Sequence, residues 1–347
     1  MCYYLTSSGN YQLYITAKAA GSSTYTNSVT LDVLVENTVY YEGSDYNYFE
    51  GTLQDALSAG DYITMSAPVY LKLTGEGTTT IQGTTGTLPQ LAAMVASMNS
   101  DSVVLDLSEV TGITAIKEGD CLLPQKNNLV GLILPETLET IEESVFGYDF
   151  SPSGMEPRLT LEIGSNVNSI GVMFVDYTAA PFKKFVVSNA NTSFATDIDG
   201  TLLMNKDKTV IVHSVNTTKV SIPDSVTEIS NYAFSGRDKF QEIYLNKVEI
   251  IGTGAFYGIQ WPANYEFELC STVKAIGATA IGTGVTIADF GFSDWYYTSD
   301  ETTWRNWITT GTVDPADLEQ NGGTLDEDDL SEMPAKLQAG KYFYRAD

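Results

Sequence analysis

The fold is decided by residues 222–234, which read Ile222-Pro-Asp-Ser-Val226-Thr-Glu-Ile229-Ser-Asn-Tyr-Ala233-Phe234. Their apolar positions are separated by steps of 4, 3, 4 and 1 residues. The same steps, with a proline in the same place, recur in residues 134–146. Residues 163–175 and 269–281 repeat the steps without the proline, and residues 245–256 match with one residue deleted. A spacing repeated this often indicates an internal structural repeat.

The period of the repeat comes from its third apolar position, which recurs at residues 116, 141, 170, 229, 251 and 276. The intervals are 22 to 29 residues, except for one of 59 that we interpret as holding an insertion near residues 186–214. A period in the twenties with one short strand per unit is typical of leucine-rich repeats. One unit cannot bury its apolar side chains alone, whereas stacked units can.

The wording of the repeats resembles one subfamily, the BspA-like leucine-rich repeats of bacterial surface proteins. The likeness is carried by Ile222-Pro-Asp-Ser-Val-Thr-Glu-Ile-Ser-Asn-Tyr-Ala-Phe-Ser-Gly and by Ile251-Gly-Thr-Gly-Ala-Phe-Tyr-Gly. It covers roughly residues 103–290, is specific for 219–258, and is degenerate elsewhere. The resemblance implies a surface or secreted protein that binds host or neighbouring-cell components, and it supplies no catalytic residues.

The expected fold is an α/β solenoid of irregular leucine-rich repeats, each with a short strand and a turn or short helix. Before it, residues 10–18 and 28–35 alternate apolar and polar side chains, which predicts an antiparallel pair of strands. We interpret residues 1–37 as the last strands of a truncated, Ig-like β-sandwich. Because two strands alone are marginally stable, the rest of that module is expected upstream.

Residues 38–102 are interpreted as an acidic, tyrosine-rich connector followed by an N-terminal cap. A short helix is expected at 52–58, a strand at 69–73 and a longer helix at 88–98, where apolar residues follow one face. The solenoid is assigned to 103–290. Residues 291–347 hold three of the four tryptophans, and we expect a small aromatic-rich C-terminal cap in which Trp295-Tyr-Tyr pairs with Tyr342-Phe-Tyr.

The charge of the chain limits its partners. Forty-four acidic residues against 18 basic ones give a formal net charge of −26. Such a surface repels phosphate backbones and anionic lipid headgroups, so we expect no nucleic-acid ligand, and cations or basic proteins are its natural electrostatic partners. No stretch approaches the roughly 20 apolar residues of a membrane-spanning helix.

Cysteine and histidine usage argues against a metal or a disulfide framework. The three cysteines, Cys2, Cys121 and Cys270, form no close pair, and His213 is the single histidine. We therefore expect no zinc site, no other metal and no cofactor. Cys121 and Cys270 lie in the repeat region and are predicted to be small buried residues.

One motif suggests an enzyme. Asp197-Ile-Asp199-Gly-Thr201 has the pattern of the haloacid-dehalogenase-like phosphatases, in which the first aspartate attacks phosphorus and both carboxylates frame Mg²⁺. That chemistry requires the end of a buried parallel strand, but here a loop precedes the motif. Asp199-Gly is a turn signal, so we predict a hairpin. A phosphatase and a weak Ca²⁺ site are the alternatives.

The candidate ligand-binding residues come from strand alternation. If Leu107, Leu134, Ile163, Ile222, Leu245 and Leu269 point inward, then the residues one and three positions before them point outward. This outward face is partly acidic and carries one aromatic residue. The predicted ligand-binding residues are Asp106, Glu162, Glu242, Tyr244, Glu266 and Glu268.

The sequence therefore predicts a non-catalytic, adhesin-like protein that binds an extracellular protein through the repeat face. The alternative is a carbohydrate-binding module in which the C-terminal Trp/Tyr cluster is exposed and stacks on sugar rings. Cell-surface or secreted localisation follows from the resemblance. The first residues, Met1-Cys-Tyr-Tyr-Leu-Thr, lack a basic region followed by an apolar stretch, so we expect the export signal upstream of this chain.

Overall fold

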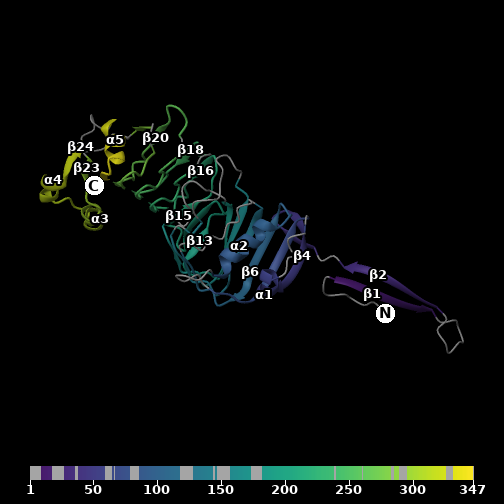
Figure 1. The fold of residues 1–347 in the computed structure, drawn as a ribbon. Helices are drawn as coiled ribbons and strands as arrows, with labels where there is room; N and C mark the ends of the chain where they lie inside the picture. The colour runs from purple at the N-terminus through teal and green to yellow at the C-terminus, as the bar shows by residue number, and fades with distance from the viewer. Residues whose placement is uncertain are drawn as a thin grey trace.

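A computed structural model describes most of the 347 residues of the chain. The described residues are 9–17, 27–35, 38–58, 65, 67–78, 86–117, 128–143, 145–146, 157–172, 182–237, 240–259, 261–282, 285–288, 295–325 and 331–346. The predicted N-terminal strand pair is confirmed: β1 (Gly9–Ala17) and β2 (Asn27–Val35) pair antiparallel over their whole lengths. They lie at one end of the molecule, away from the repeats (Figure 1).

The tyrosine-rich segment forms strands, whereas the sequence suggested a connector. β3 (Thr38–Tyr41) and β4 (Ser44–Thr52) form a hairpin. Glu42 and Gly43 at its turn both have positive φ, 45° and 91°. Two such residues make the tight turn that matches strand twist, which explains the hairpin. Through β4 it joins a seven-stranded sheet of order β12-β10-β8-β6-β5-β4-β3.

Two helices complete the N-terminal end of this sheet. The chain runs β4, α1 (Leu53–Ser58), β5 (Val69–Glu76), α2 (Thr87–Ser97) and β6 (Val103–Thr111), and the three strands pair in parallel. The helices supply the crossovers that parallel strands require. Leu53 of α1 and Leu91 and Val95 of α2 are buried in the core of the sheet, so the helices cover its inner face (Figure 1). The strand and both helices predicted here are confirmed.

Each later coil of the chain begins with a first strand, and most coils add a short second strand. The first strands are β6, β8 (Leu129–Ile133), β10 (Leu159–Ile163), β12 (Phe182–Val187), β16 (Lys219–Ser221), β18 (Glu242–Tyr244), β20 (Glu266–Glu268) and β22 (Thr286–Ala288). The second strands have two residues each: β7 (Ala115–Ile116), β9 (Thr140–Ile141), β11 (Ser169–Ile170), β17 (Glu228–Ile229), β19 (Ile250–Ile251) and β21 (Ala275–Ile276). Every second strand ends on the third apolar position of the sequence repeat. Neighbouring second strands of the same sheet pair in parallel, as in a solenoid.

Turns, not helices, close the described coils. Between residues 128 and 288, the described part of the chain contains no α-helix. Tyr232 and Gly236, at φ 58° and 70°, interrupt the turn that follows β17, and Gly254 at φ 59° does the same one coil later. Because left-handed residues break a run of helical hydrogen bonds, a helix cannot form there. The coils that follow β17 and β19 are therefore strand-and-turn units.

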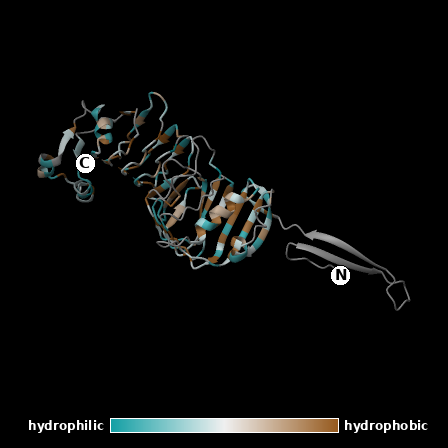
Figure 2. Ribbon diagram, in the orientation of Figure 1, coloured by the Kyte–Doolittle hydropathy of each residue, from teal (hydrophilic) through white to brown (hydrophobic). Residues whose placement is uncertain are grey.

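The Ala-Phe pairs of the repeat lie in the core, as their spacing predicted. Phe234 and Phe256 stack with ring centroids 5.1 Å apart, and Ala233 and Ala255 beside them are fully buried. Figure 2 shows apolar and polar residues alternating along strands of the seven-stranded sheet. Apolar strand residues such as Leu71, Leu105 and Leu161 are buried in its core. Fully burying one large apolar side chain contributes roughly 1.5–3 kcal/mol, so the stacked coils stabilise one another.

The long interval of the repeat is a complete coil. It comprises β12, β13 (Phe194–Thr196), β14 (Leu202–Asn205) and β15 (Val210–Ser214). β12 pairs in parallel with β10 of the preceding coil, and β15 pairs in parallel with β17 of the following coil. The segment therefore continues the array in both directions. The predicted hairpin is present, since β14 pairs antiparallel with both β13 and β15.

Strand β14 divides the interior into two cores. Leu203 belongs to the core of the seven-stranded sheet, whereas its neighbours Leu202 and Met204 belong to the core of the following coils. All three side chains are buried. On the neighbouring strand β15, His213 and Ser214 contact the buried side chain of Arg237. The Nη2 of Arg237 lies 2.6 Å from the Nε2 of His213 and donates to the carbonyl oxygen of Ser214 at 2.8 Å. Burial lowers the pKa of Arg237 to about 9.

The C-terminal segment adds strands to the sheet of second strands. β25 (Tyr342–Tyr344) pairs antiparallel with β21 and with β23 (Trp295–Thr298), which in turn pairs with β24 (Gly322–Leu325). The pairing of Trp295-Tyr-Tyr with Tyr342-Phe-Tyr is thus confirmed. Helices α3 (Glu301–Thr310), α4 (Pro315–Asn321) and α5 (Met333–Gln338) complete the segment. Among the described residues, no helix combines the length and apolarity that a membrane crossing needs.

Candidate functional site

The outward face of the first strands divides into two parts, which we call the covered face and the open face. The covered face lies on β6, β8 and β10, where the outward residues are Val104, Asp106, Gly131, Ile133, Thr160 and Glu162. The open face lies on β16, β18 and β20, where they are Lys219, Ser221, Glu242, Tyr244, Glu266 and Glu268.

The tip of the β3–β4 hairpin covers the first of these faces. A Cβ added at Gly131 would lie 2.8 Å from Cε1 and from the hydroxyl oxygen of Tyr41, so the tyrosine ring occupies the space above this glycine. The Nζ of Lys184 on β12 lies 2.8 Å from Oε1 of Glu42, which ties the turn to the far strand of the sheet. Ring contacts of Tyr41 with Tyr46 and Tyr70, with centroids 6.1 and 5.9 Å apart, complete the cover.

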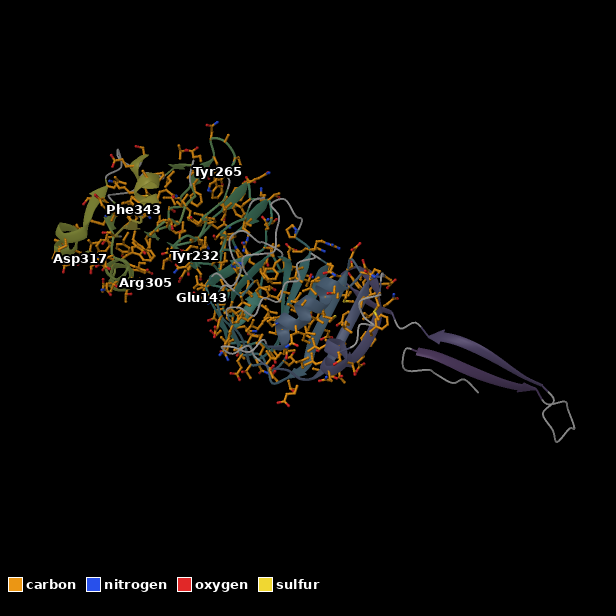
Figure 3. All side chains as sticks on the ribbon, viewed as in Figure 1. Glu143, Tyr232, Tyr265, Arg305, Asp317 and Phe343 are labelled. Atoms are coloured by element: carbon orange, nitrogen blue, oxygen red, sulfur yellow. The ribbon has the colours of Figure 1, made fainter. Side chains whose placement is uncertain are left out.

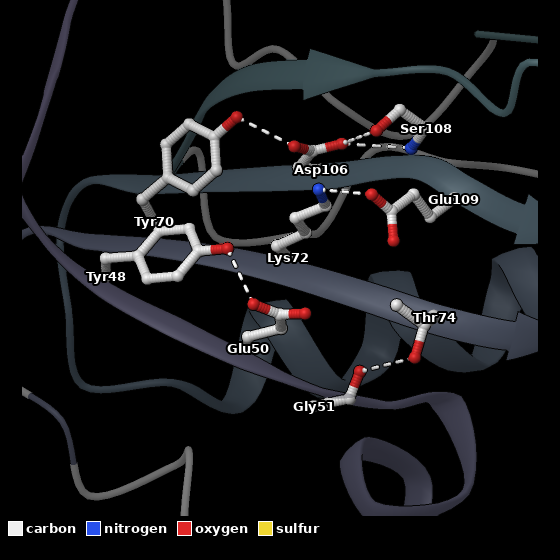
Figure 4. Close-up of polar contacts among 9 residues, drawn as sticks. All are labelled: Tyr48, Glu50, Gly51, Tyr70, Lys72, Thr74, Asp106, Ser108 and Glu109. Atoms are coloured by element: carbon white, nitrogen blue, oxygen red, sulfur yellow. Dashed lines mark hydrogen bonds and ion pairs between the residues drawn. The ribbon is translucent and has the colours of Figure 1, made fainter. Parts of the chain in front are cut away.

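Asp106 was predicted to be an exposed ligand-binding residue, and the structure shows it buried, with 7% of its surface accessible. The Tyr70 hydroxyl donates to its Oδ2 at 2.8 Å, and both the backbone N–H and the hydroxyl of Ser108 donate to its Oδ1 (Figure 4). The prediction of an exposed Asp106 was wrong because tyrosines from neighbouring strands pack over it. Its carboxylate holds the sheet face together.

Glu162 is half-buried beside the hydroxyl of Tyr41. Burial is the main cause that raises the pKa of this carboxyl, and the carboxylates of Asp106 and Glu42 add to it. Burial and the Glu162 carboxylate in turn raise the pKa of Tyr41. Asp106 and Glu162 thus lie two strands apart on one tyrosine-lined surface, and little of either carboxylate is available to a protein partner.

The open face presents a different arrangement around Tyr244, which is 40% exposed. The Tyr244 hydroxyl donates to Glu242, and Lys219 on the neighbouring strand binds the same carboxylate at 2.9 Å. The Nζ of Lys219 also lies 4.7 Å from the centre of the Tyr244 ring. These contacts lower the pKa of Glu242, with the Tyr244 hydrogen bond as the largest cause, and raise the pKa of Lys219, mainly through Glu242.

Glu266 and Glu268 on β20 extend this surface, and both are exposed. Four of the six predicted residues thus lie on the open face: Glu242 and Tyr244 on β18, and Glu266 and Glu268 on β20 of the next coil. The two strands are not paired with each other, since β18 pairs with β16 and β20 pairs with β22. An exposed aromatic ring flanked by carboxylates can bind a basic side chain through charge pairing and a cation–π contact. Lys219 shows that the geometry accepts a lysine.

The phosphatase-like motif forms the predicted hairpin turn between β13 and β14. Oδ2 of Asp197 accepts a hydrogen bond from the Thr201 hydroxyl at 2.6 Å, and Oδ1 accepts one from the backbone N–H of Leu202 at 2.8 Å. Both carboxylate oxygens thus stabilise the turn. Within the described ranges, no three His, Cys, Asp or Glu side chains are grouped so as to hold a metal ion.

The C-terminal tryptophans do not form an exposed stacking platform. Trp295, Trp304 and Trp307 are each 1% exposed. The indole N–H of Trp304 donates to the carbonyl of Phe343 at 2.7 Å, and that of Trp307 donates to Asp317 at 2.9 Å. Phe343, Asp317 and Arg305 mark this segment in Figure 3. The three indoles are packing elements.

Of the three cysteines, the structure describes Cys270, and it is half-buried where the sequence predicted full burial. Its Sγ lies 3.5 Å from the carbonyl oxygen of Val248. Cys2 and Cys121 lie outside the described residues.

The sequence prediction missed the tyrosines of the covered face, above all Tyr41, Tyr46 and Tyr70. The signal was present, because Tyr46, Tyr48 and Glu50 alternate with other residues at strand spacing and follow the turn dipeptide Glu42-Gly43. Net acidity and the absence of large aliphatic residues favoured a connector instead.

A comparison with protein families identifies the repeats that carry the open face. Six copies of the family described as BspA type Leucine rich repeat region match residues 207–293. These residues are a BspA-type leucine-rich repeat region. The BspA-type repeats thus run from the turn before β15 to beyond β22, and the resemblance inferred from the sequence is confirmed.

Solved structures that resemble the chain include three leucine-rich repeat or surface proteins. A leucine-rich repeat protein from Eubacterium ventriosum is 20% identical at a TM-score of 0.35, and the match covers 55% of this chain and 61% of that protein. The pneumococcal vaccine antigen PcpA is 18% identical at 0.37, over 64% and 62%. A leucine rich cell surface protein from Faecalibacterium prausnitzii is 12% identical at 0.35, over 80% and 86%. The chain spans about three fifths of the first two, and no curated protein matches it.

Proposed function

We propose that this protein is a non-catalytic, adhesin-like interaction protein of the bacterial cell surface or secreted fraction. It binds a protein of a host or neighbouring cell through the open face. The observation that carries the proposal is the set of Glu242, Tyr244, Glu266 and Glu268 on consecutive BspA-type coils, of which Glu242 is half-exposed and the other three are exposed. Solenoids use such repeated, extended faces for protein recognition.

The chemistry of the open face selects the kind of partner. Glu242 beside the exposed Tyr244, with Glu266 and Glu268 on the first strand of the next coil, favours a basic segment, and the net charge of −26 attracts it over a longer range. Lys219, which binds both Glu242 and the Tyr244 ring, occupies the position that a lysine or arginine of the partner would take. The partner's cation would displace it or bind beside it, toward Glu266 and Glu268.

The C-terminal segment supports this proposal as a structural element. We place residues 291–347 as the cap of the array, since β25 pairs with the last second strand and the tryptophans are buried. The carbohydrate-binding alternative required exposed, coplanar tryptophans, and no observation at this end of the molecule now favours it.

The test is a binding screen of the purified chain against an array of extracellular-matrix proteins, at physiological and at high salt. We expect a basic protein to bind, and its affinity to fall with salt because surface charges are screened. The triple variant Glu242→Lys, Glu266→Lys, Glu268→Lys should weaken that binding about tenfold or more. The matched control reverses three exposed carboxylates elsewhere: Glu76→Lys, Glu139→Lys and Glu143→Lys.

The control has the same net charge as the triple variant, so a general charge effect would weaken both equally. Equal losses, or an array without any salt-sensitive ligand, would refute the open face as the binding site.

A further inference from the structure

A pocket of about 420 Å³ lies at the opposite end of the repeats, where the tip of the β3–β4 hairpin meets the sheet. Tyr41 and Tyr46 form its hairpin side, and Ser102, Arg158, Thr160 and Lys183 lie where β6, β10 and β12 begin. This volume is within the range of small-molecule pockets, about 300–1,000 Å³. It accommodates one or two sugar rings.

The pocket is basic within a strongly acidic chain. Arg158 and Lys183 both line it. Among its described lining residues the one carboxylate is Glu42, and Lys184 binds that carboxylate at 2.8 Å. Half-buried Glu162 lies behind Tyr41 and is not part of the lining. In a chain whose acids outnumber its bases 44 to 18, a pocket lined by an arginine and a lysine favours an anionic ligand.

Arg158 suits a carboxylate in particular. Its Nη2 lies 3.2 Å from the Ser102 hydroxyl, and this hydrogen bond orients the guanidinium at the pocket. Its charge also lowers the pKa of the Tyr46 hydroxyl, against the larger raising effect of burial, so the two groups are close. A guanidinium presents parallel N–H donors that match the two oxygens of a carboxylate.

The remaining lining groups suit a polyhydroxylated ring. Ser44, Ser102 and Thr160 bring hydroxyl-bearing side chains to the lining, and Tyr41 and Tyr46 bring aromatic rings. Tyr41 and Tyr46 meet edge to face at 6.1 Å, which fixes both rings. Such a mixture of hydroxyls, aromatic rings and one guanidinium is the donor set that an acidic sugar needs.

We propose that this pocket binds a carboxylate-bearing sugar, with the carboxylate on Arg158, Lys183 as a second cation, and the ring against Tyr41 and Tyr46. The site is separate from the open face, so the protein has two binding regions of opposite charge: an acidic face for a basic protein and a basic pocket for an acidic sugar. It does not depend on the proposed protein ligand.

The test titrates the full chain with glucuronate, glucose, acetate and inorganic phosphate by isothermal calorimetry. We expect glucuronate to bind at least tenfold more tightly than the other three, since glucose lacks the charge and acetate and phosphate lack the ring. Arg158→Gln should weaken glucuronate binding tenfold or more, and Arg158→Lys should recover part of it, because lysine keeps the charge without the fork. Arg158 is exposed, so both variants should keep the thermal midpoint.

Lys247→Gln is the control for a general loss of charge, since this lysine is exposed on another part of the chain. Its Nζ lies 3.7 Å from Oδ2 of Asp224. It should leave glucuronate binding unchanged, as should the triple variant of the open face. Absence of glucuronate binding, equal affinity for acetate or phosphate, or an unchanged affinity in Arg158→Gln would each overturn the proposal.

Discussion

The covered face and the open face use the same register of the same kind of strand, and their residues differ in size and charge. Three residues before each inward-pointing apolar residue of the repeat, the covered face has Val104, Gly131 and Thr160. The open face has Lys219, Glu242 and Glu266 at the same positions. The first three are buried, whereas two of the others are exposed and Glu242 is half-exposed. The difference follows from the β3–β4 hairpin, which lies over one half. A strand face in a solenoid is a binding surface only where nothing from the same chain packs on it.

The largest effect on stability is expected at strand β14, which separates the two cores. Leu203→Ala and Met204→Ala should each lower the free energy of unfolding by about 2–5 kcal/mol, because each leaves a cavity in a closed core. Since the two side chains face different cores, hydrogen exchange should rise mainly in residues 129–187 for the first variant and in 219–276 for the second. Ile198→Ala, at a 98% exposed position of the same hairpin, should change stability by less than about 0.5 kcal/mol. Equal exchange in both halves for both variants would show that the halves unfold as one unit.

Gly131→Ala tests the cover itself. The new methyl group would lie within 3 Å of the Tyr41 ring, so the ring must move, and we expect a loss of about 1–3 kcal/mol. Chemical denaturation measures this loss, and near-ultraviolet circular dichroism reports the tyrosine displacement. Ser221→Ala on the uncovered half is the matched control and should have almost no effect. An unchanged Gly131→Ala stability would mean that the hairpin does not rest on the sheet in solution.

Glu162→Gln tests whether a buried carboxyl on the covered face makes stability depend on pH. Because burial raises the pKa of Glu162, the folded state favours the protonated carboxyl, and its stabilising contribution is present below the ordinary pKa and lost as pH rises through the raised one. The variant should therefore raise the thermal midpoint at pH 7, by about 1–2 °C, and lose this advantage at pH 4. Glu268→Gln on the open face, where the side chain is exposed, is the control for the amide substitution and should change the thermal midpoint little at pH 7. A gain for Glu162→Gln that persists at pH 4 would contradict burial as the cause.

A small effect on stability is expected at Tyr244. Tyr244→Ala removes a partly exposed ring and its contact with Lys219, and surface contacts of this kind contribute about 0.5–1 kcal/mol at most. Its effect on protein binding should be larger than its effect on the unfolding midpoint. The opposite ranking would make this residue a structural member of the strand face.

Much of the fold followed from the sequence because the repeat is periodic. The positions of Ile116, Ile141 and Ile229 located second strands, and the Ala-Phe pairs located the core. Contacts between distant segments had no such signal. Nothing in the spacing around Asp106 shows that Tyr70, 36 residues earlier, would bind its carboxylate. Four of the six predicted site residues lie on the open face because no segment of the described chain interrupts the local alternation there, although their ligand-binding role stays a prediction.

The coil formed by β12 to β15 has a consequence for how such a protein changes in evolution. β12 ends the seven-stranded sheet and β16 begins a separate one, while β15 alone continues into the following second strands. Duplication or loss of a repeat beyond this junction would lengthen or shorten the open face by one coil and leave the register of the seven-stranded sheet, its tyrosine cover and its pocket intact. One region of the gene can therefore diversify toward new partners while the other stays constant.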